Sequence, residues 1–403
     1  MVTFLEKGLI RMNEHMFDEI LEKRQTGSVK WDGLKQLFGS DELIPMWVAD
    51  MDVRPADSIT KALTKRAASG NFGYSLFEEE AKYAIQHWFK KRYNQSVDPA
   101  TILYSNGVVP ALAHSVLALT EENDEIIIQT PVYPPFHHVI EANGRRLIEN
   151  PLRLQNDRYE IDFSMLEKQM KTARMIILCN PHNPTGRVFS YDELQRLVAL
   201  AKKYGVYVLS DEIHADLLFS EATHHPIIAF DYDQVILVSA PSKTFNIPGL
   251  YASYLIVPNA DLRLKIEQVQ QANFVHPNAF ATTAIIAAYT DPNSEAWLRE
   301  LLLYLEENRN HAVERVQTEM PRLTVVVPDA TFLLWIDCRA LPFDSKERAE
   351  WLVEQAGLAL THGQPFGKNA SAFERLNFGC PRSQLDEALN RLRTAYEAIV
   401  FTD

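Results

Sequence analysis

Short, uninterrupted runs of apolar residues alternate with helical patterns through the middle of the chain. The runs are rich in Ile, Val and Leu, which is typical of strands buried on both faces of a parallel sheet. They lie at residues 125–129, 174–179, 206–210, 234–239 and 253–257. Because strands and helices follow one another in turn, the pattern predicts an α/β fold with a mostly parallel sheet between two layers of helices.

The helix between the second and the third of these runs has readable ends. Ser190 and Glu193 have the spacing of a capping box, in which each side chain bonds to the backbone of the other residue. Gly205 follows the last apolar turn, where a glycine commonly ends a helix. The sequence therefore predicts a helix between these signals.

The pattern changes after about residue 290. Residues 295–320 predict one long amphipathic helix. Short apolar strands and a last helix follow it, and that helix is expected to begin at Ser383 with Asp386 in its first turn. This mixture of strands and helices is typical of a separate α+β unit.

The first 45 residues contain a short helical pattern at 12–24 and then a loose stretch. We expect this segment to pack on the C-terminal unit. The resulting prediction is a large domain over residues 46–290 and a smaller, discontinuous domain made of residues 1–45 and 291–403.

Composition and charge narrow the possible partners. Apolar residues make up 46% and charged residues 23%, as in an ordinary globular protein. The 53 acidic residues outnumber the 40 basic ones, and this net charge of −13 argues against nucleic acid or a membrane surface as partner, since both are polyanionic. Three cysteines far apart in the sequence predict neither a disulfide framework nor a cysteine metal site.

Neither a signal peptide nor a membrane span is expected. The first 25 residues carry charges throughout and lack the apolar core of a signal peptide. No apolar run approaches the ~18 residues that a spanning helix needs. We expect a cytoplasmic protein that holds no metal.

Polar side chains follow four of the predicted strands. Tyr133, Asn183, Asp211 and Lys243 each come shortly after the end of a different strand. Ligands of open α/β sheets bind at the carboxyl ends of the strands, so we expect these four residues to meet at one site. A ring, an amide, a carboxylate and an amine together suit a cofactor site.

Each of these residues alone also has an ordinary structural interpretation. Lys243 could be a surface lysine, Asp211 a helix cap and Asn183 a turn residue. Tyr133 could pack in the core, and His214 could be structural. The joint occurrence of these residues in this order favours the site.

Several segments resemble the fold-type I pyridoxal-phosphate enzymes of the aminotransferase class I and II superfamily. The segments are PVYPPF (131–136), NPHNPTG (180–186), SDEIH (210–214) and SKTFN (242–246). Two others, PMWVADMD (45–52) and RLNFGCPRS (375–383), are similar to the MalY/PatB branch of cystathionine β-lyase-like carbon–sulfur lyases. The resemblance runs from about residue 17 to 395.

The resemblance implies pyridoxal 5′-phosphate as the cofactor and assigns roles around its ring. Lys243 matches the lysine that binds the cofactor covalently and then acts as the base at the substrate Cα. Asp211 matches the carboxylate that pairs with the pyridinium nitrogen. Asn183 matches the amide bonded to the ring's phenolic oxygen, Tyr133 the aromatic residue stacked on the ring, and His214 a supporting residue of the cofactor site.

The phosphate and the substrate have further expected partners. Gly107 and Val108, at the start of an apolar helical pattern, and the hydroxyl of Ser242 offer hydrogen-bond donors to the phosphate. Tyr74 matches a tyrosine that reaches the phosphate of the neighbouring subunit, which implies a homodimer with shared sites. Arg375 matches the arginine that binds the α-carboxylate of the substrate.

The chain departs from many superfamily members near the phosphate. Tyr251 stands where they carry a phosphate-binding arginine, and Ala240 stands where they carry a serine. The usual arginine clamp on the phosphate is therefore not expected in this chain.

The amine-binding cofactor and the carboxylate-binding arginine imply an L-amino acid substrate. The MalY/PatB resemblance implies β-elimination at the Cβ–S bond of a thioether, cystathionine or a cysteine S-conjugate, which gives a thiol, pyruvate and ammonia. Two alternatives stay open. One is an aminotransferase, which uses the same residues, and the other is a regulatory protein that retains the fold and docks to another protein.

Overall fold

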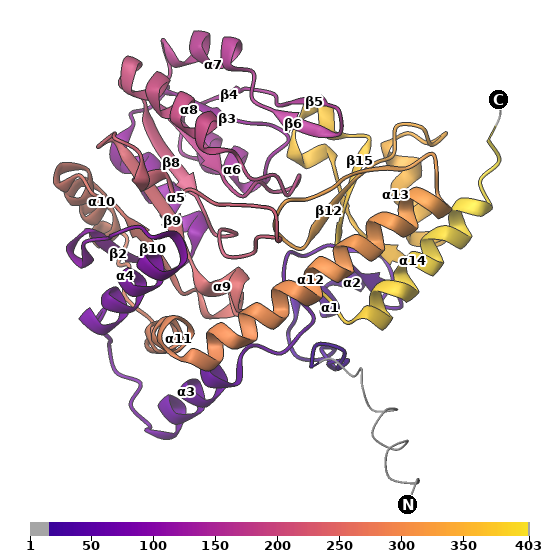
Figure 1. Ribbon diagram of the computed structural model, residues 1–403, viewed down its shortest axis with the longest axis horizontal. Helices are drawn as coiled ribbons and strands as arrows, with labels where there is room; N and C mark the ends of the chain where they lie inside the picture. Colours follow the sequence, from indigo (N-terminus) through magenta and orange to yellow (C-terminus); the bar gives the residue numbers. More distant parts are fainter. Residues whose placement is uncertain (1–15, 402–403) are drawn as a thin grey trace, which may run out of the picture.

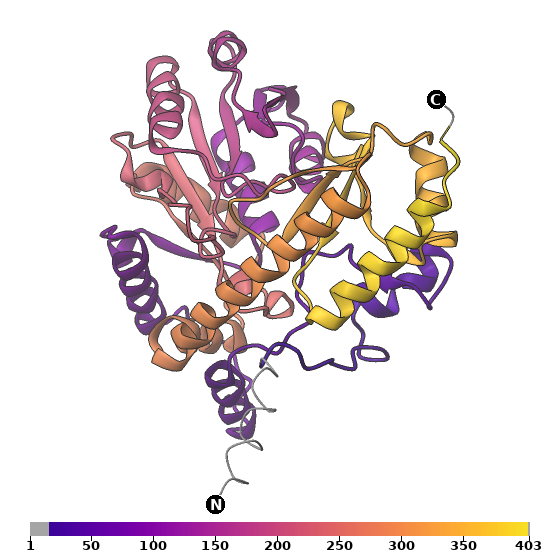
Figure 2. The same cartoon turned by 45° about the vertical axis from the view of Figure 1, so that its right-hand side comes forward.

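The computed structural model describes residues 16–401, which form a large sheet and a smaller sheet with a long helix, α12 (Pro292–Glu319), running past both (Figure 1). This helix runs from α11 (Ala279–Thr290), beside the large sheet, to the smaller sheet, as both views show (Figure 2). The long amphipathic helix predicted at 295–320 is confirmed, and it begins three residues earlier. Asp291 caps its first turn by accepting from the backbone N–H of Asn293.

The large sheet confirms the predicted α/β fold. Its strand order is β2–β10–β9–β8–β7–β3–β4, and only β10 runs antiparallel to its neighbours. In that order the strands are β2 (Ile102–Ser105), β10 (Ser253–Ile256), β9 (Val235–Ser239), β8 (Tyr207–Asp211), β7 (Met175–Cys179), β3 (Glu125–Ile128) and β4 (Arg146–Glu149). All five predicted strands are present, whereas the apolar pattern did not identify the edge strands β2 and β4.

Helices cover both faces of this sheet, which explains why its central strands are apolar without interruption. Alternate strand residues enter two separate cores. One core contains the helices α5 (Val108–Leu119), α6 (Pro135–Ala142) and α10 (Ala260–Ala272). The other contains α4 (Glu79–Tyr93), α7 (Phe163–Met170), α8 (Tyr191–Tyr204) and α11.

The predicted ends of α8 are confirmed. Ser190 accepts from the backbone of Glu193, and the Glu193 side chain accepts from the backbone of Ser190, so both halves of the capping box are formed. Gly205 ends the helix in the left-handed conformation with φ 68°, which a glycine adopts without a steric penalty.

The smaller sheet is antiparallel, with the order β11–β12–β15–β14. Its strands are β11 (Thr324–Val326), β12 (Leu333–Asp337), β15 (Phe373–Asn377) and β14 (Thr361–His362). The helices α12, α13 (Ser345–Glu354) and α14 (Arg382–Glu397) lie beside this sheet (Figure 1). The last helix begins at Arg382, with Pro381 as its cap and no side-chain cap, so the predicted start at Ser383 is wrong by one residue.

The N-terminal part differs most from the prediction. Residues 16–24 form turns and irregular chain, so the described part of the helix predicted at 12–24 is wrong, and residues 12–15 lie outside the described residues. The aromatic ring of Phe17 packs against those of Trp297 and Tyr304, with 5.5 Å between ring centroids in each pair. This contact with α12 replaces a local helix as the means of burying the apolar side chain.

The remaining α-helices and two strand pairs lie outside the two sheets. They are α1 (Val29–Asp32), α2 (Leu34–Phe38), α3 (Asp57–Ala68), α9 (Pro241–Thr244), and the strand pairs β1–β13 (Ile44–Pro45 with Leu358–Ala359) and β5–β6 (Arg153–Gln155 with Arg158–Glu160). The pair β1–β13 joins the N-terminal segment to the C-terminal part. The division into domains at residues 46 and 290 stays a prediction. Among residues 16–401, no helix is long and apolar enough to cross a membrane.

Candidate active site

A cavity of about 220 Å³ lies at the carboxyl ends of β3, β7, β8 and β9. These strands are adjacent and parallel, so the residues that follow them meet at one edge of the sheet. Eight of the expected site residues line the cavity: Gly107, Val108, Tyr133, Asn183, Asp211, His214, Ser242 and Lys243. Arg375 is bonded to one of them, Asn183. A larger hollow of about 800 Å³ beside α6 contains none of them.

Lys243 lies in α9, a single helical turn that follows β9. Its Nζ donates to the main-chain oxygen of Ala49 at 2.5 Å. Burial lowers the pKa of its amine to about 8, with a further lowering from Arg375 and opposing effects from Asp50 and Asp211. The lowered pKa makes the neutral amine, which a nucleophile or a base requires, accessible near neutral pH.

Asp211 is the last residue of β8 and is buried. Its Oδ1 accepts from the backbone N–H of Ile213 at 3.1 Å, and its Oδ2 has no hydrogen-bond partner in the described part of the chain. Burial raises the pKa of this carboxyl to about 7, against the lowering effects of the Ile213 N–H and of Lys243. The bond to Ile213 caps a turn rather than a helix, so the helix-cap interpretation is wrong.

Asn183 and Arg375 connect the two sheets across the cavity. The Nη1 of Arg375, in β15, donates to Asn183 Oδ1 at 2.9 Å. An arginine only donates, so the Asn183 carbonyl must face it, and the NH₂ group of the amide is free to donate elsewhere. Asn183 also sits in a turn after β7, so its turn interpretation and its site interpretation are compatible.

Arg375 is buried without a counter-charge. Its Nη2 donates to the main-chain oxygen of Trp47 at 2.8 Å and to Thr361 Oγ1 at 3.2 Å, and its Nε is buried with no partner. No Asp or Glu among residues 16–401 forms an ion pair with it, and burial lowers the pKa of its guanidinium to about 10. A buried cation of this kind favours a bound carboxylate as its partner.

Tyr133 and His214 complete the wall of the cavity. Burial raises the pKa of the Tyr133 phenol, so the ring is neutral. Burial lowers the pKa of His214 to about 3, with smaller effects from Lys243 and Arg375, so its imidazole is neutral as well. The ring of His214 lies edge-on to Phe332 with 6.0 Å between centroids, and its Nδ1 is buried without a partner in the described chain.

The start of α5 forms the end of the cavity that could accept an anion. Gly107 caps this helix with φ 138°, and no side chain caps it. A Cβ at Gly107 would lie 3.1 Å from Pro110, which is tighter than ordinary contact. The first N–H groups of α5 and the buried hydroxyl of Ser242 therefore face the cavity as donors, beside Tyr251.

These groups fit pyridoxal phosphate. The Asp211 carboxyl has one unpartnered oxygen and a raised pKa, so it suits a protonated ring nitrogen. A positive charge beside Asp211 would lower its pKa again and favour the ionised carboxylate. The free amide NH₂ of Asn183 suits a phenolic oxygen, and the amine of Lys243 suits an aldehyde. The start of α5, where no side chain bonds to the first N–H groups, suits a phosphate. The carboxylate, the amide, the helix start and the amine thus match four different groups of pyridoxal phosphate.

Tyr74 lies away from this cavity. It is fully exposed, in the segment between α3 and α4, and it is not among the residues that line the cavity. A role in its own subunit's site is therefore not supported, and its expected reach to a neighbouring subunit stays a prediction.

The sequence interpretation gave no role to the main-chain oxygens of Trp47 and Ala49. The motif PMWVADMD was identified as a mark of the family branch, but the structure adds that its backbone contacts both Arg375 and Lys243. The motif itself was the available signal. Cys179, Pro248 and Ser253 also line the cavity.

Comparisons with known proteins agree with this geometry. Residues 42–392 match the family "Aminotransferase class I and II". The chain is 40% identical to cystathionine beta-lyase PatB of Bacillus subtilis, over 94% of this chain and 99% of PatB. It is 32% identical to protein MalY of Escherichia coli, over 95% of this chain and 99% of MalY.

A solved structure is similar over almost the same length. Cystalysin from Treponema denticola, whose crystal structure contains a pyridoxal 5′-phosphate cofactor, superposes with a TM-score of 0.91 at 32% identity, covering 94% of this chain and 98% of cystalysin. The fold, the motifs and the cavity thus agree with these likenesses. The chain belongs to the aminotransferase class I and II family of fold-type I pyridoxal-phosphate enzymes, in its MalY/PatB branch of carbon–sulfur lyases.

Proposed function

We propose that the chain catalyses β-elimination at the Cβ–S bond of an L-amino acid thioether, cystathionine or a cysteine S-conjugate, and releases a thiol, pyruvate and ammonia. It is a pyridoxal-phosphate-dependent carbon–sulfur β-lyase, like its relative PatB. The observation that carries the proposal is that Lys243 and Asp211 line one cavity and that the Arg375 guanidinium is bonded to Asn183, which lines the same cavity.

Arg375 would bind the α-carboxylate of the substrate, and Lys243 would act on its Cα. Arg375 binds the α-carboxylate with its planar fork and so fixes the orientation of Cα. When bound, pyridoxal phosphate withdraws electrons from Cα through its conjugated ring. Lys243, whose pKa of about 8 makes the neutral amine accessible, would take the proton from Cα onto Nζ.

Asp211, Asn183 and Tyr133 would hold the electron-withdrawing ring. Asp211 would keep the nitrogen of the cofactor ring protonated, Asn183 would donate to the phenolic oxygen of the ring, and Tyr133 would pack against the ring. Gly107, Val108 and Ser242 would hold the phosphate through the donors at the start of α5.

The reaction is balanced by one water molecule. The Cα–H bond breaks and its proton goes to Lys243, then the Cβ–S bond breaks and the electron pair leaves with sulfur. The thiolate takes up a proton, and it is a better leaving group than an alkoxide because thiols have a pKa of only ~8.5. Water hydrolyses the remaining three-carbon product to pyruvate and ammonia.

One assay separates this function from its alternatives. The purified protein, loaded with pyridoxal phosphate, is given cystathionine and several S-alkyl cysteines, and pyruvate and keto-acid exchange are followed in the same tube. Release of pyruvate with an equal amount of thiol supports the lyase. Amino transfer to a keto acid without pyruvate would identify an aminotransferase, and a protein that binds no cofactor would support the regulatory alternative.

Arg375→Ala is expected to raise KM by about 10- to 150-fold and to change kcat little. A charge-assisted hydrogen-bonded pair contributes ~1.5–3 kcal/mol, and here it would act on the bound substrate and on the transition state alike. Steady-state kinetics with the best thioether measure the effect. Arg339→Ala, which removes an exposed arginine paired with Asp337, is the matched control, and an unchanged KM in Arg375→Ala would reassign Arg375.

The homodimer and the role of Tyr74 belong to the same proposal. Phe72, Tyr74 and Leu76 are all exposed in one segment, and such apolar exposure is typical of an interface. We expect a C₂ dimer in which this segment of each subunit reaches the other subunit's phosphate end.

Mixing two inactive variants tests the shared site. Tyr74→Ala and Lys243→Ala, each weak alone, are unfolded together and refolded at equal concentrations. Random pairing gives hybrids with one intact site, so about a quarter of wild-type activity should return. A mixture no more active than its parents, or a chain that sediments as a monomer, would contradict the shared site.

A cytoplasmic location is part of the proposal as well. All three cysteines, Cys179, Cys338 and Cys380, are buried and unpaired, which suits a reducing compartment.

A further inference from the structure

The segment of residues 46–52, which we call the strap, contacts both cations of the active site through its backbone. The Trp47 oxygen accepts from Arg375 Nη2 at 2.8 Å, and the Ala49 oxygen accepts from Lys243 Nζ at 2.5 Å. These two acceptors are only two residues apart in the chain. Any movement of the strap would therefore move the partners of the expected base and of the expected carboxylate-binding group together.

The strap has no regular secondary structure after Met46, so other segments must hold it. Asn377 Nδ2 donates to the oxygens of Val48 and Asp50, each at 2.6 Å. Asn246, three residues after Lys243, accepts from the N–H of Met51 at 2.9 Å and donates to its oxygen at 2.9 Å. The segment that follows Lys243 and the strand that contains Arg375, β15, are thus each bonded to the strap by one asparagine.

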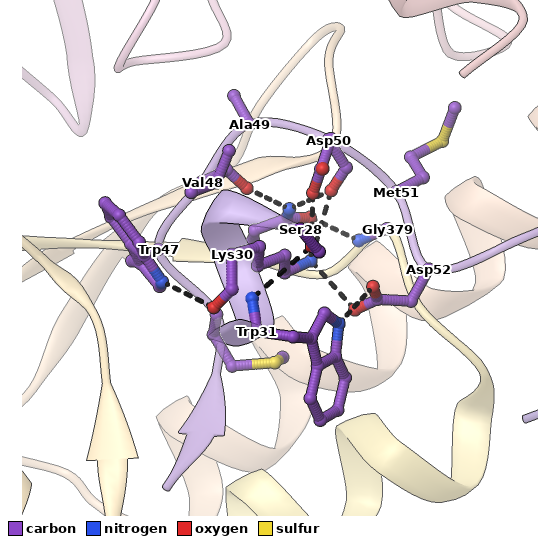
Figure 3. Close-up of polar contacts among 12 residues, drawn as sticks. Ser28, Lys30, Trp31, Trp47, Val48, Ala49, Asp50, Met51, Asp52 and Gly379 are labelled. Atoms are coloured by element: carbon purple, nitrogen blue, oxygen red, sulfur yellow. Dashed lines mark hydrogen bonds and ion pairs between the residues drawn. The ribbon is translucent and has the colours of Figure 1, made fainter. Parts of the chain in front are cut away.

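A buried ion pair fixes the far end of the strap (Figure 3). Lys30, from α1, has an exposed fraction of only 1%. Its Nζ lies 2.8 Å from Asp52 Oδ2, 3.1 Å from the main-chain oxygen of Asp50 and 3.5 Å from Asp50 Oδ1. The contacts to Asp52 Oδ2 and to the Asp50 main-chain oxygen are hydrogen bonds, whereas the contact to Asp50 Oδ1 is an ion pair only. All three oxygens belong to the strap.

Asp52 is the centre of this arrangement. It also accepts from Trp31 Nε1 at 3.0 Å and Gln384 Nε2 at 3.0 Å, and Lys23 Nζ lies 3.1 Å from it. Although burial alone would raise its pKa, Lys30 and Lys23 hold the pKa of this carboxyl at about 2. The pair is therefore fully ionised at neutral pH, and segments from α1 and from α14 converge on one strap residue.

A buried ion pair is weak evidence for stability, because well-packed apolar residues of the same size often stabilise a fold as well or better. Its advantage is geometric, since charge-assisted hydrogen bonds specify one arrangement of the atoms that they join. At Lys30 the specified atoms lie on the segment that bears the acceptors for Lys243 and Arg375. None of the groups proposed to bind cofactor or substrate contacts Lys30 directly.

We propose that the buried pair of Lys30 and Asp52 is a positioning device for the active site. It holds the strap so that the oxygens of Ala49 and Trp47 orient the free amine of Lys243 and the guanidinium of Arg375 with respect to each other. This inference rests on the roles proposed above for Lys243 and Arg375. Lys30 and Asp52 are positioning residues, and the base and the carboxylate partner act only through the geometry that they set.

The expected consequence is a joint effect on kcat and KM. The amine of Lys243 is restricted by its bond to Ala49, so a shifted strap would misplace the base and lower kcat. Arg375 would lose its alignment through Trp47, and KM would rise. Misplacements of about 1 Å caused by distant mutations reduce rates by up to about 100-fold.

The test compares Lys30→Met with Arg54→Gln. Lys30→Met keeps the length of the side chain but removes its donors. Arg54 lies two residues beyond the strap and forms an exposed ion pair with Glu19. Arg54→Gln breaks that pair and is the matched control. With thioether substrate and saturating cofactor, Lys30→Met should lower kcat by about 10-fold and raise KM by about 10-fold, while Arg54→Gln should stay within about twofold of wild type. Lys30→Arg, which keeps the charge, should recover part of both losses.

A second readout does not depend on turnover. Calorimetric titration with propionate, a carboxylate without an amine, reports the alignment of Arg375. The Kd for propionate should rise about 10-fold in Lys30→Met and stay unchanged in Arg54→Gln. If the wild type released no pyruvate, the proposed function would fail, but this shift in Kd would still support the strap.

Folded Lys30→Met protein with the wild-type kcat, KM and Kd for propionate would overturn the inference, because a purely structural lysine predicts that result. If Lys30→Met does not fold, Trp31→Phe takes its place, since it keeps an aromatic ring, smaller than indole, and removes one donor to Asp52. Trp31→Phe should shift the same three quantities by a few-fold in the same directions. Unchanged values in that variant would equally overturn the inference.

Discussion

Lys243→Ala should lower kcat for thioether cleavage by about 10⁴-fold, the upper end of what a positioned general base contributes. The amine is expected both to bind the cofactor and to take the Cα proton, and no other lysine lines the cavity among residues 16–401. His214 is a poor substitute base because burial lowers its pKa to about 3, and Asp211 is expected to pair with the ring nitrogen. Pyruvate release under saturating cofactor is the measurement.

Two controls make this result specific to the amine. Lys202→Ala removes an exposed lysine paired with Asp231 and should leave kcat unchanged. Borohydride reduction followed by mass spectrometry should attach the cofactor to the peptide that contains Lys243 in the wild type and in Lys202→Ala, but not in Lys243→Ala. A Lys243→Ala protein that retained more than about 1% of the wild-type kcat would refute the assignment.

Asp211→Asn should lower kcat by about 10²- to 10³-fold, as is typical when one preorganised electrostatic partner is removed from an active site. The asparagine has nearly the same shape but carries no charge, so the ring nitrogen would lose the partner that keeps it protonated. Exchange of the substrate's Cα hydrogen with deuterated solvent, followed by NMR, measures this step separately from the departure of the thiol.

The matched control is Asp231→Asn, a fully exposed carboxylate of the same type. Since burial raises the pKa of Asp211 to about 7 without cofactor, the charge is costly in the apoprotein. The apoprotein of Asp211→Asn should therefore unfold at no lower temperature than wild-type apoprotein, which separates a catalytic loss from misfolding. An unchanged Cα exchange rate would contradict the role of Asp211.

Much of the fold was predictable because buried strands and helix ends have characteristic local sequences. The central strands of the large sheet are apolar on both faces, and the capping box of α8 needs only two residues at the right spacing. The predicted site was accessible for a related reason. Tyr133, Asn183, Asp211 and Lys243 follow four strands, and parallel strands bring their carboxyl ends to one edge of the sheet.

The errors arose where the local pattern does not record contacts between distant parts of the chain. The apolar spacing at residues 12–24 predicted a helix, but Phe17 is buried against Trp297 and Tyr304, and Lys23 donates to the backbone of Met51. These long-range contacts satisfy the same side chains without a helix. The antiparallel direction of β10 was also not predictable, because its apolar pattern is the same in either direction.

The sequence by itself determined the α/β class, the positions of the central strands and the set of side chains at their ends, since each depends on residue identity and spacing. Only the tertiary structure decided which atoms meet across the cavity. Arg375 and Asn183 are 192 positions apart, and Lys243 bonds to Ala49 across 194 positions. The acceptors at Ala49 and Trp47 are main-chain oxygens, which every residue possesses, so residue identity carries no trace of them, and their positions follow from how distant segments pack.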